Sequence, residues 1–163
     1  MEIQDPASER LDALDSVLDE YEKSLGLHKY AEDFHDNSVK SYMGMGRTEM
    51  EKLTLEECAE AALILGSFSF HLQRSYNRES ARVNWAQSSL KETVSGRETQ
   101  YSGSWESQYH QAVKNDGYSS KLMRIKKYAQ QRADRLNYLS NSVKNLSDLF
   151  INLQKAKATK RHE

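Results

Sequence analysis

The sequence predicts an all-α protein built around a long antiparallel helical hairpin, preceded by an additional acidic helix. Apolar residues recur in steps of three and four over two long stretches, helix-capping residues stand before them, and a stretch rich in Gly and Ser separates them. Each stretch must bury its apolar stripe, and a short connection makes the other stretch the nearest partner. Because the resulting core is narrow, we also expect a homo-oligomer.

The N-terminal segment is expected to form the acidic helix and a connector. Asp5 before Pro6 is typical of an N-cap, and Gly26 suits a helix stop, so we predict a helix over about 6–25. From 27 to 52 we expect a connector with at most a short helix around Tyr30–Val39 and a flexible loop at Tyr42–Gly46. The expected apolar seam of the first helix is Leu11, Leu14, Leu18, Tyr21 and Leu25.

The first long helix of the hairpin has a clear start signal. Thr54 and Glu57 form a T-x-x-E capping box, which predicts a helix from Thr54 to about Val94. Gly66 has a low helix propensity, but we expect the predicted helix to continue through it. Its expected seam is Leu65, Leu72, Tyr76, Glu79, Val83, Ala86 and Leu90.

The hairpin tip and the last helix follow. Ser104 is expected to cap a short helix that ends near the Asn115–Gly117 turn, and a single helix is predicted over 118–157. Nine of its ten seam positions are apolar, which is the cleanest periodicity in the chain. They are Leu122, Ile125, Ala129, Arg132, Leu136, Leu139, Val143, Leu146, Phe150 and Leu153.

Each seam contains one charged residue, and the two predict the register of the hairpin. Placing Leu90 near Lys121 also places Glu79 opposite Arg132. An unpaired charge in the seam would cost several kcal/mol. We therefore expect Glu79 and Arg132 to form an ion pair that sets the register.

The net charge of −1 conceals a strong asymmetry. Residues 1–60 hold 16 Asp or Glu and 6 Lys or Arg, whereas residues 61–163 hold 8 and 17, which gives −10 and +9. We divide the chain into an acidic helix with its connector (1–52) and a hairpin core (53–163). The acidic helix is expected either to mask the basic surface or to dock onto a basic partner.

Composition also bears on location and class. No segment has the roughly 18 to 20 uncharged apolar residues of a membrane span, and Cys58 is the only cysteine, so we expect a cytoplasmic protein with no membrane partner. Glu57 and Glu60 give an E-x-x-E spacing, but a second acidic motif for a metal site is lacking. We expect no enzyme activity and no cofactor. A metal-dependent all-α nucleotide hydrolase remains a third hypothesis.

Binding of single-stranded nucleic acid is the leading functional hypothesis. Arginines recur every four residues on the first long helix, and the last helix begins with a basic half beside the tip. Cations for phosphates next to aromatic rings for unstacked bases are typical of single-strand binding. The expected phosphate contacts are Arg74, Arg78, Arg82, Arg97, Lys121, Arg124 and Lys127, and the expected stacking rings are Tyr101 and Trp105.

The order of these features resembles the recombination mediators of T4-like phages. The shared features are the acidic start, Leu27–Tyr30, the Arg-rich helix, the Tyr101–Gly103 tip and the Leu136–Leu139 step. The resemblance covers about 54–157, and it implies a helical, ring-forming protein that binds single-stranded DNA. It also implies help in loading a recombinase where a single-strand-binding protein must be displaced. The runner-up hypothesis is a phage structural or scaffold-type protein that self-assembles without binding nucleic acid.

Overall fold

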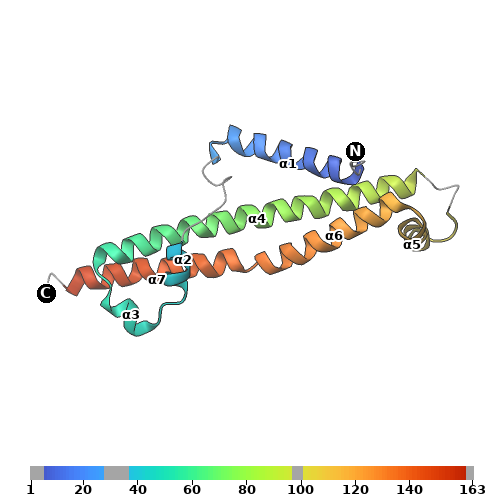
Figure 1. Cartoon of the computed structure of the whole chain (residues 1–163). Coiled ribbons are helices and arrows are strands. Elements are labelled where there is room, and N and C mark those ends of the chain that lie inside the picture. Colours follow the sequence, from blue (N-terminus) through green and yellow to red (C-terminus); the bar gives the residue numbers. More distant parts are fainter. Residues whose placement is uncertain (1–5, 28–36, 97–100, 161–163) are drawn as a thin grey trace. The chain divides into compact units, whose positions relative to one another are not determined.

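A computed structural model of the chain describes residues 6–27, 37–96 and 101–160. Helices make up nearly all of these residues, and no strand occurs among them, so the predicted all-α class is confirmed (Figure 1). The helices are α1 (Pro6–Ser24), α2 (Asn37–Met43), α3 (Arg47–Lys52), α4 (Leu55–Ser95), α5 (Trp105–Asn115), α6 (Gly117–Leu136) and α7 (Leu139–Lys160).

The chain forms two compact units, and each unit takes two separate stretches of the sequence. The first unit comprises residues 1–27 and 76–134, and the second comprises residues 28–75 and 135–163. The 41-residue helix α4 contributes its second half to the first unit and its first half to the second. The predicted division at residue 52 follows charge rather than packing, and it stays a prediction.

The first unit contains α1, the second half of α4, α5 and α6. Leu90 of α4 and Leu122 of α6 are fully buried in one cluster, and Ala7 of α1 joins them. Val94 and Ala112 belong to a further cluster, in which α5 packs against the end of α4. The pairing of Leu90 with Leu122 agrees with the predicted register of the hairpin.

The predicted ion pair between the seams is present in the first unit. Nη2 of Arg132 lies 2.9 Å from Oε2 of Glu79, at ion-pair distance although without the alignment of a hydrogen bond. The Glu79 side chain is only 10% exposed, and its other oxygen accepts a 2.8 Å hydrogen bond from Arg82. The seam on α6 passes through buried Ala133, so Arg132 reaches Glu79 from the edge of the interface.

The second unit contains α2, α3, the first half of α4 and α7. Its core includes Leu65, Leu72, Val143 and Phe150. Small residues let α4 and α7 approach closely, and serine hydroxyls of α7 bind carbonyl oxygens of α4. The two hydrogen bonds run from Ser140 Oγ to the Ser69 carbonyl at 3.0 Å and from Ser147 Oγ to the Ala62 carbonyl at 2.7 Å. The partner numbers fall on α4 as they rise on α7, so these helices are antiparallel.

The predicted connector 27–52 is more helical than expected within the described residues, and the predicted loop at Tyr42–Gly46 is confined to residues 44–46. Tyr42 and Met43 end helix α2, and a further helix, α3, follows Gly46. The Tyr42 ring packs edge-on against Phe150 with centroids 5.9 Å apart, which explains why the segment is ordered on the core. Lys157 of α7 holds the end of α3 by donating to the carbonyls of Glu51 and Leu53. Of the predicted helix around Tyr30–Val39, only residues 37–39 fall within the described part, and they are helical.

Several predicted helix ends are confirmed. The Thr54 amide donates to Glu57 Oε2 at 2.7 Å, and the Glu57 amide donates to Thr54 Oγ1 at 3.1 Å, which completes the capping box. Ser104 Oγ accepts from the Ser107 amide at the start of α5. Gly26 has φ of +73°, a left-handed conformation typical of a residue after a helix. The predicted N-cap Asp5 lies outside the described residues.

The prediction of one helix over 118–157 was wrong. The segment forms two helices, because Asn137 and Tyr138 turn between α6 and α7. The Tyr138 carbonyl accepts from both the amide and the hydroxyl of Ser142, which starts the new helix. The Tyr138 side chain is largely exposed. Neither Gly nor Pro marks this break.

Cys58 is buried, as expected for a small apolar side chain, and burial raises the pKa of its thiol. Among the residues described, no helix is long and apolar enough to cross a bilayer.

Candidate nucleic-acid interface

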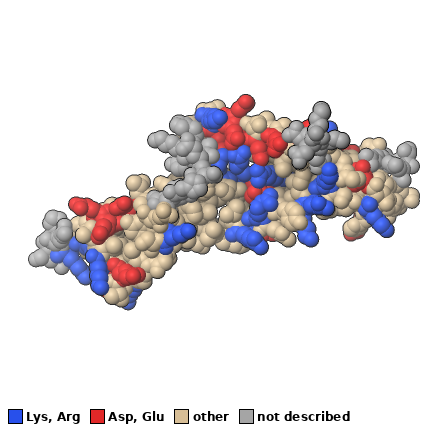
Figure 2. Space-filling model, in the orientation of Figure 1, with Lys and Arg blue, Asp and Glu red and all other residues tan. Residues whose placement is uncertain are grey.

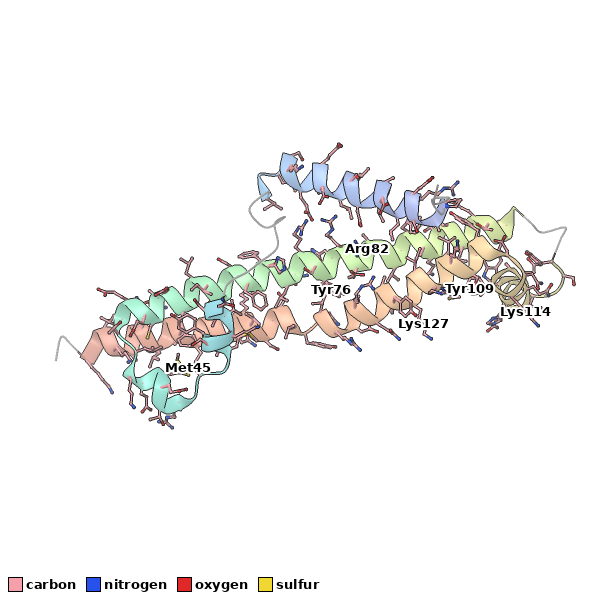
Figure 3. The ribbon with its side chains drawn as sticks, viewed as in Figure 1. Met45, Tyr76, Arg82, Tyr109, Lys114 and Lys127 are labelled. Atoms are coloured by element: carbon pink, nitrogen blue, oxygen red, sulfur yellow. The ribbon has the colours of Figure 1, made fainter. Side chains whose placement is uncertain are left out.

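The arginines of α4 face acidic residues of α1 within the first unit. The Arg82 side chain lies between α1 and α4 (Figure 3). Its Nε and Nη2 donate to the two carboxylate oxygens of Asp15 at 3.2 and 2.6 Å, in the bidentate geometry of a strong Arg–carboxylate pair. The hydrogen bond to Asp15 is the main reason why the pKa of Arg82 is raised. The Arg82 guanidinium also binds Glu79, so carboxylates of the same chain balance the positive charge of Arg82.

Arg78 is held in the same way. Its Nη1 donates to Asp19 at 2.6 Å, and its Nη2 donates to the Asp15 carbonyl at 3.2 Å. Glu22 lies 3.9 Å away, and the Arg78 side chain is only 15% exposed. Two of the three predicted arginines of the α4 stripe therefore contact carboxylates where phosphates were expected. Arg74 belongs to the second unit and is half-buried.

The hairpin tip supplies fewer accessible nucleic-acid contacts than predicted. Tyr101 is 7% exposed and packs in a core cluster with Val94 and Ala112, so its ring faces are not open to bases. The turn at Gly103, with φ of +103°, precedes the Ser104 cap of α5. Trp105, the first residue of that helix, remains exposed. The predicted contact Arg97 lies outside the described residues.

Helix α6 carries the most accessible basic surface of the first unit. Between Gly117 and Asp134 it has five Lys or Arg and a single carboxylate. Figure 2 shows basic side chains gathered over α6 and acidic side chains over α1. Lys121, Arg124 and Lys127, all predicted contacts, are exposed, and Lys127 points away from α4 (Figure 3).

One aromatic residue of this surface was missed as a site residue. Tyr128 is 52% exposed and follows Arg124 by four positions, which places both on one face of the helix. Its sequence signal was its place off the apolar seam, one turn from a cation on each side. We call Lys121, Arg124, Lys127 and Tyr128 the α6 basic face.

The N-terminus of α6 is fixed by a cap that positions this face. Oδ2 of Asp116 accepts from the amide of Ser119 at 2.9 Å and from its hydroxyl at 2.6 Å. Ser119 and Leu122 are fully buried, so the first turn of α6 is anchored on the core side. The cations at 121, 124 and 127 therefore project from a held helix rather than from a loop.

Glu57, the first residue of the E-x-x-E spacing, has a structural role as part of the helix cap. The Glu57 carboxylate binds the Thr54 amide and hydroxyl, which lowers the pKa of Glu57. In the described part of the chain no group of three or more His, Cys, Asp or Glu side chains is placed to hold a metal ion.

The second unit has an open apolar groove between α3 and α7. Its volume is about 460 Å³, and Met50, Leu149 and Leu153 form most of its lining. Arg47 and Glu51 form an exposed ion pair at its edge, with 2.8 Å between Nε and Oε1. The groove lacks the convergent polar groups of a small-molecule site.

Comparison with protein-family models, with curated proteins and with solved structures finds no match for this chain.

Proposed function

We propose that this chain binds single-stranded DNA through the α6 basic face and acts by binding rather than by catalysis. The observation that carries the proposal is the exposed group of Lys121, Arg124 and Lys127 around the exposed ring of Tyr128. Flexible cations neutralise phosphates without regard to sequence, and an aromatic ring stacks on any base.

The resemblance to recombination mediators extends this proposal. A mediator must bind a strand weakly enough to release it to the recombinase. A small helical face suits that task better than a deep pocket. We therefore propose that the chain helps to load a recombinase where a single-strand-binding protein covers the strand. A shorter lag in recombinase assembly on covered DNA when the chain is added is the expected result.

Binding is tested with a fluorescent oligothymidine and two matched variants at several salt concentrations. The test variant is K121A/R124A/K127A, and the control K144A/K155A/K160A removes the same charge from exposed positions of α7. On single strands each lost phosphate contact lowers the slope of log affinity against log salt by about 0.7, so the test variant should lose about 2. A test variant that binds with the wild-type affinity and slope would refute the proposal.

The stacking role of Tyr128 has its own test. Base–aromatic stacking contributes roughly 1 to 3 kcal/mol, so Tyr128→Ala should weaken oligothymidine binding about 5- to 150-fold with little change in salt slope. Tyr128→Phe keeps the ring and is expected to bind as the wild type does. Equal weakening by both variants would show that the ring does not stack.

A second candidate function, self-assembly without nucleic acid, is favoured by exposed apolar side chains. Val17 and Tyr21 lie one turn apart on the outer side of α1, and Leu63 is exposed on α4. The predicted seams of the two long helices are mostly buried within the units, whereas Tyr21 and Leu25 of the seam predicted for the first helix are exposed. Self-assembly would therefore use α1 and the exposed part of α4. Light scattering after size exclusion tests this, since V17S/Y21S should yield a smaller particle than the wild type if α1 joins subunits.

A further inference from the structure

Charged contacts hold helix α1 on the first unit, beside the half-buried Leu11, Leu14 and Leu18. Ala7 is its one fully buried residue among those described, and Val17 and Tyr21 point outward. Arg10 donates to the Tyr118 hydroxyl at 2.9 Å and lies over its ring. Asp15, Asp19 and Glu22 of α1 also contact arginines of α4. Partly exposed ion pairs are weakened by salt and by competing anions.

The carboxylates of α1 place anionic oxygens against the arginines of α4, as the phosphates of a nucleic-acid strand would. Arg–phosphate recognition uses the same two-pronged donor geometry that Arg82 shows toward Asp15. Asp15 and Asp19 are one turn apart, about 6 Å along the helix, and their shortest ion pairs, both 2.6 Å, are with Arg82 and Arg78 respectively. That spacing is comparable with the separation of neighbouring phosphates along a strand.

We propose that Arg78 and Arg82 form a second phosphate-binding site, which α1 occupies as an internal mimic of the strand. This inference rests on the proposed function for the ligand, but it concerns different residues. A strand bound to the α6 basic face competes with α1 for the two guanidinium groups. When α1 leaves, Arg78 and Arg82 exchange carboxylates for phosphates, so binding becomes tighter and more sensitive to salt.

The test neutralises the two carboxylates in the full-length chain. D15N/D19N keeps the side-chain shapes and removes the two α1 charges nearest the arginines, leaving Glu22 at 3.9 Å from Arg78, whereas the control D12N/E20Q removes the same charge from exposed positions of α1. We expect D15N/D19N to bind oligothymidine at least tenfold more tightly than the control. Its salt slope should be steeper by about 1.4, because two phosphate contacts are added.

A third variant assigns the gain to the arginines. Adding R78A/R82A to D15N/D19N should return both affinity and salt slope to the control values. A gain that survives the loss of both arginines would overturn the proposal, and so would equal binding by D15N/D19N and the control. Circular dichroism of each variant checks that the helices are retained.

Hydrogen exchange of the wild-type chain gives an independent measurement. Amides of α1 should lose protection when oligothymidine is added, whereas those around Leu90 and Leu122 should keep it. Unchanged protection of α1 at saturating oligothymidine would contradict the proposed competition.

The two proposals fail in different ways. If the wild type binds weakly, D15N/D19N binds well and the triple variant of α6 has no effect, the α6 basic face is refuted and the α4 site stands. If the triple variant abolishes binding and D15N/D19N has no effect, the α4 site is refuted and the α6 basic face stands.

Discussion

The ion pair between Glu79 and Arg132 gives the sharpest test of the hairpin register. We expect a double-mutant cycle with Glu79→Ala and Arg132→Ala to show a coupling free energy of about 1 kcal/mol in unfolding. Two unit charges 3 Å apart attract by about 5 kcal/mol at an effective dielectric constant of 20. Desolvation of Glu79 and solvent screening of Arg132, whose side chain is 50% exposed, offset most of this attraction.

The single variants should be unequal. Arg132→Ala leaves Glu79 paired with Arg82 at 2.8 Å, so we expect a loss of about 1 kcal/mol. Glu79→Ala removes the shared acceptor of two guanidinium groups from a nearly buried position, so we expect a loss of about 2 to 3 kcal/mol.

The assay is urea unfolding followed by circular dichroism in 50 mM and 1 M NaCl. The coupling should shrink in high salt because Arg132 is half exposed. A parallel cycle between Glu79 and Lys127, which points away from α4, should show no coupling. No measurable coupling between Glu79 and Arg132 in low salt would refute the reasoning.

Three further predictions concern α4. Thr54→Ala should lower the free energy of unfolding by about 1 kcal/mol, measured by urea unfolding at pH 7. Because the folded-state pKa of Glu57 is lowered, the contribution of its carboxylate is present above its unfolded pKa and should fade as pH falls through the folded value. An equal effect of the substitution at pH 2.5 would contradict this. Cys58, buried and with a raised pKa, should react with a thiol reagent at pH 8 at least tenfold more slowly in the native chain than in urea, and equal rates would show that the site is open. Gly66→Ala should raise stability by about 0.5 to 1 kcal/mol, because the added Cβ meets only a serine oxygen 3.6 Å away, and a lower thermal midpoint would show that this contact is too tight.

The parts of the fold that the sequence predicted correctly depend on local chemistry or on helical periodicity. The Thr54 capping box and the Ser104 cap are decided by residues three positions apart, and both are present. Pairing Glu79 with Arg132 needed only the helical period and the requirement that a buried charge be matched.

The missed parts depend on contacts between distant segments. The turn at Asn137 and Tyr138 interrupts a seam whose apolar period continues through it, so periodicity alone could not reveal it. Helices α2 and α3 are short, and they gain stability from packing on the core rather than from their own sequence.

The candidate site shows the same division. Spacing correctly indicated that Arg78 and Arg82 share one face of a helix, but it could not show that Asp15 would face them. From the charge asymmetry we could predict only that the acidic helix either masks the basic surface or docks onto a basic partner. Tyr101 was placed at an accessible tip because its neighbours are Gly and Ser, yet its ring fills the core beside Val94.

The division of α4 between two cores has a consequence for dissecting the molecule. The backbone passes from the first unit to the second, back to the first, and again to the second. A protease that cuts once therefore cannot release either unit as a continuous fragment. Ending the chain after residue 134 would also remove Val143 and Phe150 and leave Leu65 and Leu72 without that cover. Useful fragments will have to be coexpressed as pairs or rejoined by circular permutation.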